Sequence, residues 1–440
     1  MGPTYQNIRL SLLLIAWLVA VIQIILGDAA LLLANAAVCI YLIYLLMTLP
    51  MIKRGSFLII SFLGALGLLT IHDATLDDAF ATGRFVLIFA GLVPTMILAK
   101  ATASTMPSVQ KTQQALAQLP PSSSAAGLQL AGHAFGAVIN TGTFAMLSAA
   151  LSPSSTPERR KIAALAALRG MNASAAWSPF FVAFAIGQSF IEPSAAWPAI
   201  GVGVLLALGF HAVSLPIFTP HLTVSVLKAS LSCLKPISLR LLVVLATVLS
   251  VAIVFDYTAL SAVVLVMPGL VVFQFFRQPQ TVNTIITTTR TQLKFVGDDI
   301  VVISAAMILG ALMTRTDGIT TVLNLFTTDV FPAYIALIIT PVAMMLASVI
   351  GIHPVISSTV LLALFSGAGS SATPFLLMQA HLLGWATGTM SSMASLSVIT
   401  CSSLYRIPSR QLAMGANLYV SLGFAVIGGV ILTGIHYTIS

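Results

Sequence analysis

The sequence predicts an all-α polytopic membrane protein, and three observations carry that prediction. Apolar runs long enough to cross a bilayer recur from Leu10 to Thr438. Hydrophobic residues make up 58% of the 440 residues, and charged residues make up only 7%, against about a quarter in soluble proteins. The mean hydropathy is +1.05. No polar stretch between the runs is long enough to fold as a soluble catalytic domain.

A membrane span needs about 20 apolar residues, and about eleven segments meet that need. They are 10–27, 29–51, 56–72, 125–151, 162–191, 195–218, 241–255, 257–276, 332–365, 374–404 and 413–437. The first segment has the flanks of a signal peptide, but further apolar segments follow it at once, which favours an uncleaved span.

Two further apolar stretches, near 84–103 and 299–328, are interrupted by polar residues. The interrupting residues are Pro94, Thr95 and Lys100 in the first, and Gly310, Thr314, Arg315, Asp317 and Gly318 in the second. We expect re-entrant hairpins here, each returning to the side from which it enters.

The basic residues then collect on one side of the membrane, as cytoplasmic loops require. They are Arg9, Lys53, Arg54, Arg159, Arg160, Lys161, Lys228, Lys235, Arg240, Arg277, Arg290, Lys294, Arg406 and Arg410. Only Lys100 and Lys111 break the rule. We interpret the net charge of +8 as membrane topology and expect no nucleic-acid partner. The N-terminus is predicted to be cytoplasmic and the C-terminus outside.

The chain contains a weak internal repeat at an offset of roughly 210 residues, which pairs 137–140 with 348–351 and 170–178 with 384–392. We divide the chain into a first unit, 1–191, a second unit, 195–404, and an extra helix at 413–437. Each unit has three scaffold spans, a hairpin and two broken spans. Five crossings are an odd number, so the second unit is inverted. Inverted repeats with broken helices are typical of secondary transporters, and the alternative is a chance match of two apolar stretches.

Four polar breaks interrupt the long spans. Such breaks are tolerated in lipid only where they face protein, water or a ligand. The first break, Asn140-Thr141-Gly142-Thr143, offers neutral oxygens and the start of a half-helix that attracts an anion. A polar contact between helices is the alternative.

The second break is Gly351-Ile352-His353-Pro354, with Ser357 and Ser358 one turn later. Pro354 suits the first turn of a helix and leaves His353 at the gap. There His353 either binds a carboxylate and changes charge or has a structural role.

The third and fourth breaks offer amides and hydroxyls. The third contains Asn172, Trp177, Ser178 and Pro179, and the fourth contains Thr387, Gly388, Thr389, Ser391, Ser392 and Ser395. Hydroxyls there could equally serve helix packing, which we favour for Ser395 and Ser397. Arg169, near the third break, either extends to the cytoplasmic face, which we favour, or meets an anionic substrate.

We therefore predict two sets of binding residues. The substrate set is Asn140, Thr141, Gly142, Thr143, Ser178, His353, Pro354, Ser357 and Ser392. The ion set is Ile139, Asn140, Asn172, Gly351, Thr387 and Ser391.

The residues missing from the predicted spans are also informative. All acidic residues fall in loops or near span ends, so sodium bound by neutral oxygens fits better than a proton relay through a buried acid. His353 keeps proton coupling open. Zinc-ligand spacing, a P-loop and a GxSxG motif are absent from the sequence, and three scattered cysteines form no disulfide framework. We expect neither a catalytic residue nor a cofactor or metal.

This pattern resembles the ion transporter superfamily, which includes the divalent anion/sodium symporters and the large membrane subunits of TRAP-type systems. Ile139-Asn140-Thr141 is similar to the Ser-Asn-Thr motif of that family with its serine replaced, whereas Ile352-His353-Pro354 departs from the motif. The stretch 301–318 is similar to the family's second hairpin. The resemblance covers the architecture of nearly the whole chain.

The resemblance implies an elevator mechanism, in which the hairpins and broken spans move past a scaffold formed by the spans near 29–72 and 241–276. It also implies a homodimer with the scaffold at the interface. The departure at His353 leaves the substrate and the second ion site open.

The favoured function is secondary active transport of a small organic anion, a carboxylate, coupled to sodium or protons. One alternative is a membrane-embedded transferase or polymerase acting on lipid-linked sugars, which generally needs a large, charged outer loop. A passive channel is another, and it needs a continuous polar pore. We expect a bacterial inner membrane as the location, with the lipid bilayer as a partner. A periplasmic binding protein or small subunit stays open as a further partner.

Overall fold

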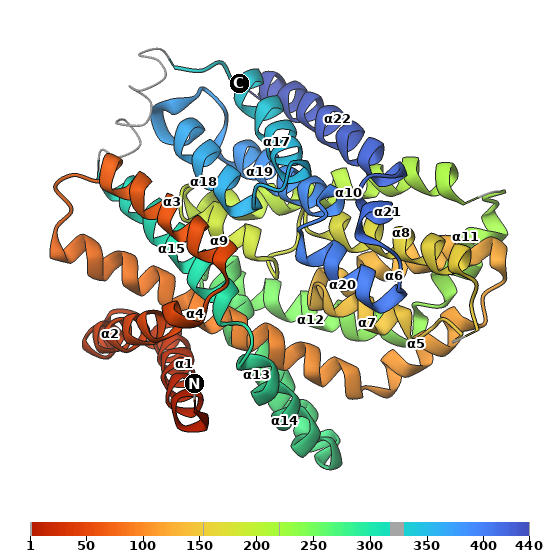
Figure 1. Cartoon of the computed structure of the whole chain (residues 1–440), viewed down its shortest axis with the longest axis horizontal. Coiled ribbons are helices and arrows are strands. Elements are labelled where there is room, and N and C mark those ends of the chain that lie inside the picture. Colours follow the sequence, from red (N-terminus) through yellow and green to blue (C-terminus); the bar gives the residue numbers. More distant parts are fainter. Residues whose placement is uncertain (1, 153, 220, 317–329, 440) are drawn as a thin grey trace.

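The computed structural model describes residues 2–152, 154–219, 221–316 and 330–439, and these fold into a bundle of helices (Figure 1). Among these residues, the one extended pairing is an isolated parallel bridge between Phe331 and Ser370. The all-α prediction is confirmed for the described part of the chain.

The helices up to residue 218 are α1 (Pro3–Leu26), α2 (Leu31–Thr48), α3 (Arg54–Thr70), α4 (Leu76–Thr105), α5 (Pro107–Ala117), α6 (Pro121–Ile139), α7 (Gly142–Ser148), α8 (Pro157–Ser174), α9 (Val182–Gln188) and α10 (Ala196–Phe218). The later helices are α11 (Val224–Ser232), α12 (Lys235–Val254), α13 (Ala259–Arg277), α14 (Val282–Leu293), α15 (Gly297–Arg315), α17 (Ala333–Val349), α18 (Pro354–Phe365), α19 (Pro374–Ser391), α20 (Leu396–Tyr405), α21 (Ser409–Ala413) and α22 (Ala416–Ile439). Short 3-10 turns occupy Gly27–Ala30, Leu49–Met51, Pro193–Ala195, Pro279–Thr281 and Gly367–Gly369.

Seven helical stretches in the described ranges are long and apolar enough to cross a membrane. They are Thr4–Met51, Leu76–Thr105, Pro193–Phe218, Lys235–Val254, Ala259–Arg277, Gly297–Arg315 and Ala416–Ile439. Their length and composition are consistent with an integral membrane protein. The four predicted broken spans each consist of two helices, and none of these helices is both long and apolar enough to belong to this set.

Hydroxyl side chains begin several of the helices, because the first backbone N–H groups of a helix need acceptors. Thr75 and Asp78 form a reciprocal capping box at the start of α4. Thr156 accepts a hydrogen bond from the Arg159 amide, with Pro157 in the first turn of α8. Ser395 accepts from the Val398 amide at the start of α20. These local signals fix where the helices start.

The hairpin predicted near 84–103 is wrong, because α4 runs through it as one continuous helix of 30 residues. Pro94 lies inside α4 and is buried. Neighbouring helices α1, α13 and α15 pack around α4, and Trp17 donates a hydrogen bond to the Thr95 hydroxyl at 3.0 Å. Proline removes one helix hydrogen bond, and surrounding protein compensates for such a loss inside membranes.

The hairpin predicted near 299–328 is continuous over its first part. α15 includes Gly310, whose missing side chain leaves room for the Phe190 ring. The remainder, including Asp317 and Gly318, lies outside the described residues.

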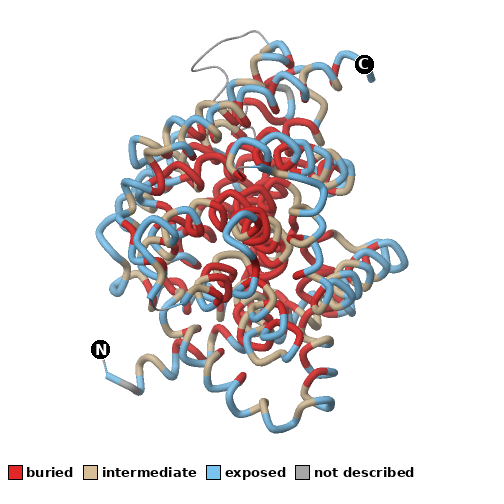
Figure 2. Tube along the Cα trace, turned by 90° about the vertical axis from the view of Figure 1, so that its right-hand side faces the viewer, coloured by how far each residue is buried: buried red, intermediate tan, exposed pale blue. Residues whose placement is uncertain are grey.

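Glycines bring the central helices into close contact, as small residues do in membrane bundles. On α6, Gly132 and Gly136 lie against the backbone of α8, and Gly170 on α8 lies against the backbone of α6. On α19, Gly384 and Gly388 lie against α17. Most residues of α6, α8 and α19 are buried, and buried residues gather at the centre of the molecule (Figure 2).

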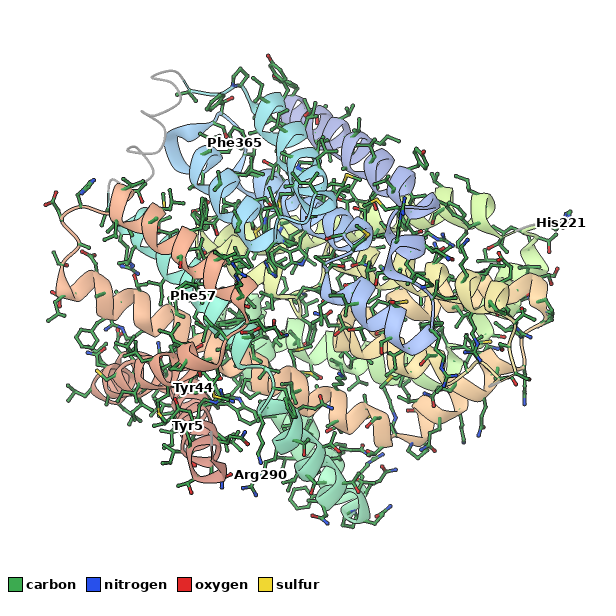
Figure 3. The ribbon with its side chains drawn as sticks, viewed as in Figure 1. Tyr5, Tyr44, Phe57, His221, Arg290 and Phe365 are labelled. Carbon is green, nitrogen blue, oxygen red and sulfur yellow. The ribbon has the colours of Figure 1, made fainter. Side chains whose placement is uncertain are left out.

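The outer helices are more exposed. α14 carries Arg290 beside the start of α1, where it donates a hydrogen bond to the Asn7 side chain at 3.3 Å (Figure 3). His221 lies at the right-hand edge of Figure 3, between α10 and α11. α12 and much of α2 expose large apolar side chains, which is expected of surfaces that face lipid.

Candidate functional site

The first break lies where it is predicted. α6 ends at Ile139 and α7 begins at Gly142, with Asn140 at a φ of +51° between them. Because its ψ is −135°, Asn140 lies outside the left-handed helical region, in a conformation that glycine adopts far more readily than other residues. Thr143 is fully buried, and its hydroxyl oxygen has no hydrogen-bond partner among the described residues. Asn140 and Thr141 are half-buried.

A lysine lies against this break. A Cβ atom added to Gly142 would stand 2.9 Å from each of three carbons of the Lys100 side chain. Lys100 is half-buried on α4, and its ammonium group has no ion pair or hydrogen bond with any described residue. The break therefore combines neutral polar groups with one uncompensated cation. The signal in the sequence was the exception that Lys100 makes to the charge rule.

The third break joins the first. Ser178, fully buried, donates a hydrogen bond to the Ala137 carbonyl at 2.5 Å and accepts one from the Phe180 amide at 3.2 Å. A Cβ atom on Gly136 would stand 2.8 Å from the Ser174 hydroxyl oxygen. Ser178 thus ties the end of α6 to the segment between α8 and α9, and its hydroxyl proton is already used inside the protein.

The fourth break, between α19 and α20, holds its hydroxyl groups in local hydrogen bonds. Thr387 donates to the Leu383 carbonyl and Ser391 to the Thr387 carbonyl, both at 2.8 Å. Ser395 donates to the Thr389 carbonyl at 2.7 Å. Ser392 is buried and accepts from the Ala394 amide. Thr387, Ser391 and Ser395 therefore keep only oxygen lone pairs for a ligand, whereas the Ser392 hydroxyl donates to no described residue.

The third and fourth breaks meet through one hydrogen bond between side chains. Thr389 donates to the Asn172 side-chain oxygen at 2.8 Å, and the Asn172 amide donates to the Leu168 carbonyl at 2.9 Å. Nearby, Gln379 donates to the Ala176 carbonyl at 2.9 Å. Residues more than 200 positions apart therefore join at the centre of the bundle.

At the second break, Gly351 has a φ of +92° and Pro354 opens α18 as predicted. His353 is exposed in the structure and caps α18, with its Nδ1 accepting a hydrogen bond from the Val355 amide at 3.2 Å. Ser357 donates to the Pro354 carbonyl. His353 thus performs a structural task, while its other ring nitrogen remains available.

The second break contacts the fourth through two neighbours. The Ser348 hydroxyl oxygen lies 2.6 Å from where a Cβ atom on Gly388 would stand. His381, fully buried, has its Nε2 2.9 Å from the Ala183 carbonyl, which can only accept a hydrogen bond. Its Nδ1 lies 2.9 Å from the Ser358 hydroxyl. His381 thereby links α9, α18 and α19.

The four breaks therefore form one connected series: the first touches the third, the third touches the fourth, and the fourth touches the second. The short helices that follow the breaks cross over between the two halves of the chain, because α7 contacts α20 and α9 contacts α18. The third and fourth breaks in this series are largely buried, whereas Gly351, Ile352 and His353 of the second break are exposed.

Arg169 does not extend to the surface, contrary to the favoured interpretation. Its side chain is only 2% exposed. It donates hydrogen bonds to the Gln129 oxygen at 3.2 Å and the Asn417 oxygen at 3.1 Å. The guanidinium carbon lies 3.9 Å above the centre of the Phe218 ring. Arg169 is thus a buried cation held by neutral groups.

Acidic groups are missing from this region. In the described ranges, the one salt bridge joins Lys53 to Asp298 at 3.7 Å, and no three residues of the metal-binding types lie together. The chemistry available is therefore neutral oxygens, amide donors and two cations. Such a set favours an anion. The set also includes one hydroxyl paired with an imidazole, Ser358 with His381.

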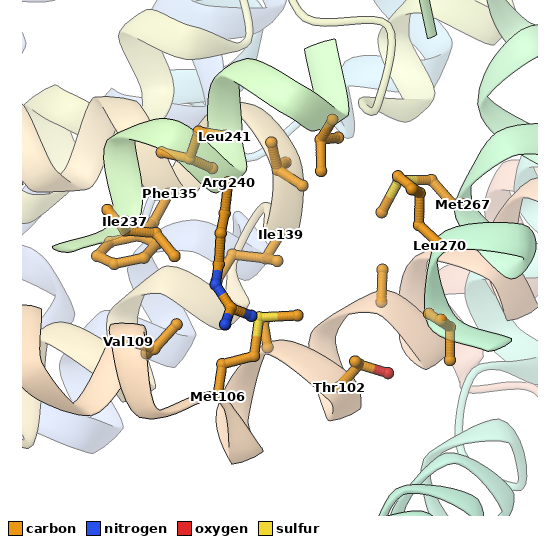
Figure 4. A pocket seen from close by; sticks show the side chains of 15 residues that line it. Thr102, Met106, Val109, Phe135, Ile139, Ile237, Arg240, Leu241, Met267 and Leu270 are labelled. Carbon is orange, nitrogen blue, oxygen red and sulfur yellow. The ribbon is translucent and has the colours of Figure 1, made fainter. Parts of the chain in front are cut away.

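An apolar cavity of about 80 Å³ lies beside the first break (Figure 4). It is bounded by α4, α5, α6, α12 and α13, and its lining includes Ile139, Phe135 and Met267. Arg240 is the one charged residue in that lining. The cavity lies between the end of α6 and two of the helices predicted to form the scaffold, α12 and α13.

The chain matches no family model, and no curated protein matches it either.

Proposed function

We propose that this protein is a secondary active transporter of a small organic anion, a carboxylate, with its site at the connected helix breaks. The observation that carries the proposal is the meeting of four breaks at the centre of the bundle, with the Lys100 side chain against Gly142. Unwound backbone inside a membrane protein is tolerated where it lines a binding site, and transporters place substrate and ion sites at such breaks.

The charges support an anionic substrate. Lys100 beside the first break lacks an acidic partner among the described residues, and a carboxylate would supply one. A buried or half-buried cation without a partner is costly, so an incoming anion gains interaction energy at this point. The buried Thr143 hydroxyl, which has no partner among the described residues, is a further donor for the same anion.

Helix packing supports an inverted repeat, but with unit boundaries that differ from the 1–191 and 195–404 expected from the sequence. Equivalent contacts occur in pairs: α4 packs on α13 and α15 on α3, while α6 packs on α8 and α17 on α19. By the same correspondence, the contact between α7 and α20 is equivalent to the contact between α18 and α9. This makes α22 the counterpart of α10, so the additional helix would be α1 and not 413–437.

Charge placement supports two re-entrant hairpins, at α6–α7 and at α17–α18. With α4 crossing fully, a hairpin at α6–α7 returns Arg159 to the cytoplasmic side with Arg9. In this arrangement Lys111 on α5 also lies on the cytoplasmic side, in agreement with the rule that basic residues collect there. The chain keeps eleven crossings by this count, with the C-terminus outside.

The moving part of such a transporter would comprise the hairpins and the broken helices, and α2, α3, α12 and α13 would form the scaffold. A homodimer through the scaffold is consistent with the exposed apolar side chains of α12, which equally suit lipid. Sodium is the proposed coupling ion, bound near Asn140 and Asn172, because the site holds neutral oxygens and no acid.

The test is flux of labelled mono-, di- and tricarboxylates into proteoliposomes, with a sodium gradient, a proton gradient or none. Lys100→Met removes the charge and keeps the apolar stem that packs on Gly142. We expect at least tenfold slower uptake from Lys100→Met, and wild-type uptake from the matched control Lys111→Met. Wild-type flux in Lys100→Met would exclude the proposed role of the lysine.

Asn140 is tested better by glycine than by alanine. Glycine adopts the observed φ of +51° freely, whereas alanine would add backbone strain to the loss of the amide. We expect Asn140→Gly to insert normally and to lose transport. Absence of flux from the wild type under every gradient would count against transport itself.

A further inference from the structure

Arg169 belongs to a polar cluster that borders the third break, since the His211 ring lies 4.6 Å from the His133 ring, which accepts a hydrogen bond from Trp177. The cluster joins α6, α8, α10 and α22 through Gln129, Arg169, His211, Ser214 and Asn417. All five side chains are at most 5% exposed. None of them is acidic, so the cluster encloses one uncompensated positive charge.

The arginine determines the orientation of its amide neighbours, since a guanidinium only donates hydrogen bonds. The Gln129 oxygen must face Arg169, so its nitrogen donates to Ser214 at 2.6 Å and to His211 Nδ1 at 3.0 Å. The Asn417 oxygen likewise faces Arg169, and its nitrogen is buried without a partner among the described residues.

Several hydrogen-bond donors in or next to the cluster have no acceptor among the described residues. Since His211 Nδ1 accepts, its neutral ring carries the proton on Nε2, which is buried without a partner. The Nη2 atom of Arg169 makes no hydrogen bond to a described residue. Ser421, one turn after Asn417, has a buried hydroxyl oxygen with no partner. The Phe218 ring covers the face of the guanidinium and leaves its edge free.

We propose that this cluster binds one small anion, a carboxylate or a halide, at the Nη2 edge of Arg169. An anion would neutralise the buried charge and accept from donors that are otherwise unsatisfied. Leaving such groups unpaired is costly, and charge-assisted hydrogen bonds from arginine are among the strongest in proteins. The site differs from the one proposed for transport and requires no flux for its detection.

The test uses the full-length protein in lipid nanodiscs with a bulky sulfonate as background anion. Sodium acetate or sodium chloride is titrated at constant ionic strength, and the melting temperature is followed. A bound anion raises the melting temperature saturably. We expect this saturable rise in the wild type. The acetate and chloride arms identify which anion class is preferred.

Asn417→Asp provides the decisive variant, because it gives Arg169 a carboxylate at the same position. We expect it to melt higher than the wild type in the background buffer, and to need at least tenfold more added anion for half of the rise. Gln129→Glu places the same negative charge beside Arg169 from α6, and it is the substitute variant if Asn417→Asp fails to fold.

The matched control is Asn35→Asp, which places a carboxylate beside another arginine. There Arg84 donates to the Asn35 oxygen at 2.7 Å, between α2 and α4. We expect this control to keep the saturable rise of the wild type. Absence of a saturable rise in the wild type, or an unchanged rise in Asn417→Asp and Gln129→Glu, would overturn the proposal. Either result would leave the transport assay on Lys100 unaffected.

Discussion

The contact between Gly170 and α6 allows the effect of one substitution to be worked out from the structure. A Cβ atom at Gly170 would stand 2.0 Å from the Gln129 carbonyl oxygen and 2.9 Å from the His133 amide nitrogen. Ordinary contact begins near 3.4 Å, so Gly170→Ala requires α6 and α8 to separate by about 1.4 Å. Both neighbours are backbone atoms, so no side-chain rotation can relieve the overlap.

The expected cost follows from that geometry. Overpacking of a tight core costs about 1–3 kcal/mol. At about 2–4 °C per kcal/mol for larger domains, the melting temperature should fall by about 2–12 °C. The measurement is thermal unfolding of the purified protein, followed by size-exclusion chromatography after heating. A fall of this size, with normal expression at low temperature, is the expected result.

The control for this prediction is Gly64→Ala on α3. A Cβ atom there would meet nothing within 4 Å, and alanine is favoured over glycine in helices by about 1 kcal/mol. We expect an unchanged or slightly higher melting temperature. A Gly170→Ala protein that melts together with the wild type would refute the close packing of α6 on α8.

Three further predictions concern the breaks and the topology. Thr389→Val should cost about 1 kcal/mol of stability, because it removes the hydrogen bond to Asn172 and leaves that oxygen unpaired; equal melting temperatures would contradict this. His353→Ala should lose the cap of α18, worth about 0.5–2 kcal/mol, while His353→Asn should keep it; equal denaturation of both variants would argue against the cap. In a chain freed of its native cysteines, a cysteine at Lys111 should react with an impermeant thiol reagent only from the cytoplasmic side, and one at Glu192 only from outside. Labelling of position 111 from outside would contradict a hairpin at α6–α7.

The breaks were predictable because their signals are local. Gly351 and Pro354 stop or start helices by their own backbone preferences, whatever surrounds them. The error at 84–103 came from treating Pro94 in the same way. Neighbouring helices enclose that proline inside α4, and no sequence window contains those neighbours.

The contacts between distant residues could not be predicted for a related reason. The pairing of Lys100 with Gly142, and of Arg169 with Asn417, depends on how separate helices pack. The sequence does mark both cations as unusual, since each lies in an apolar run without an acidic neighbour at helical spacing. It contains no information on which side chains surround them.

The hydroxyl of Thr389 has one proton and two acceptors at equal distance. It lies 2.8 Å from the Asn172 oxygen on α8 and 2.8 Å from the Trp385 carbonyl in its own helix. The proton can therefore turn from one acceptor to the other without leaving the hydroxyl unsatisfied. If α8 and α19 separated, the loss from this hydrogen bond would be only the partner of one amide oxygen, about 1 kcal/mol, apart from the packing between the helices. This hydrogen bond between α8 and α19 can therefore break and form again at low cost, at the point where the two halves of the chain meet.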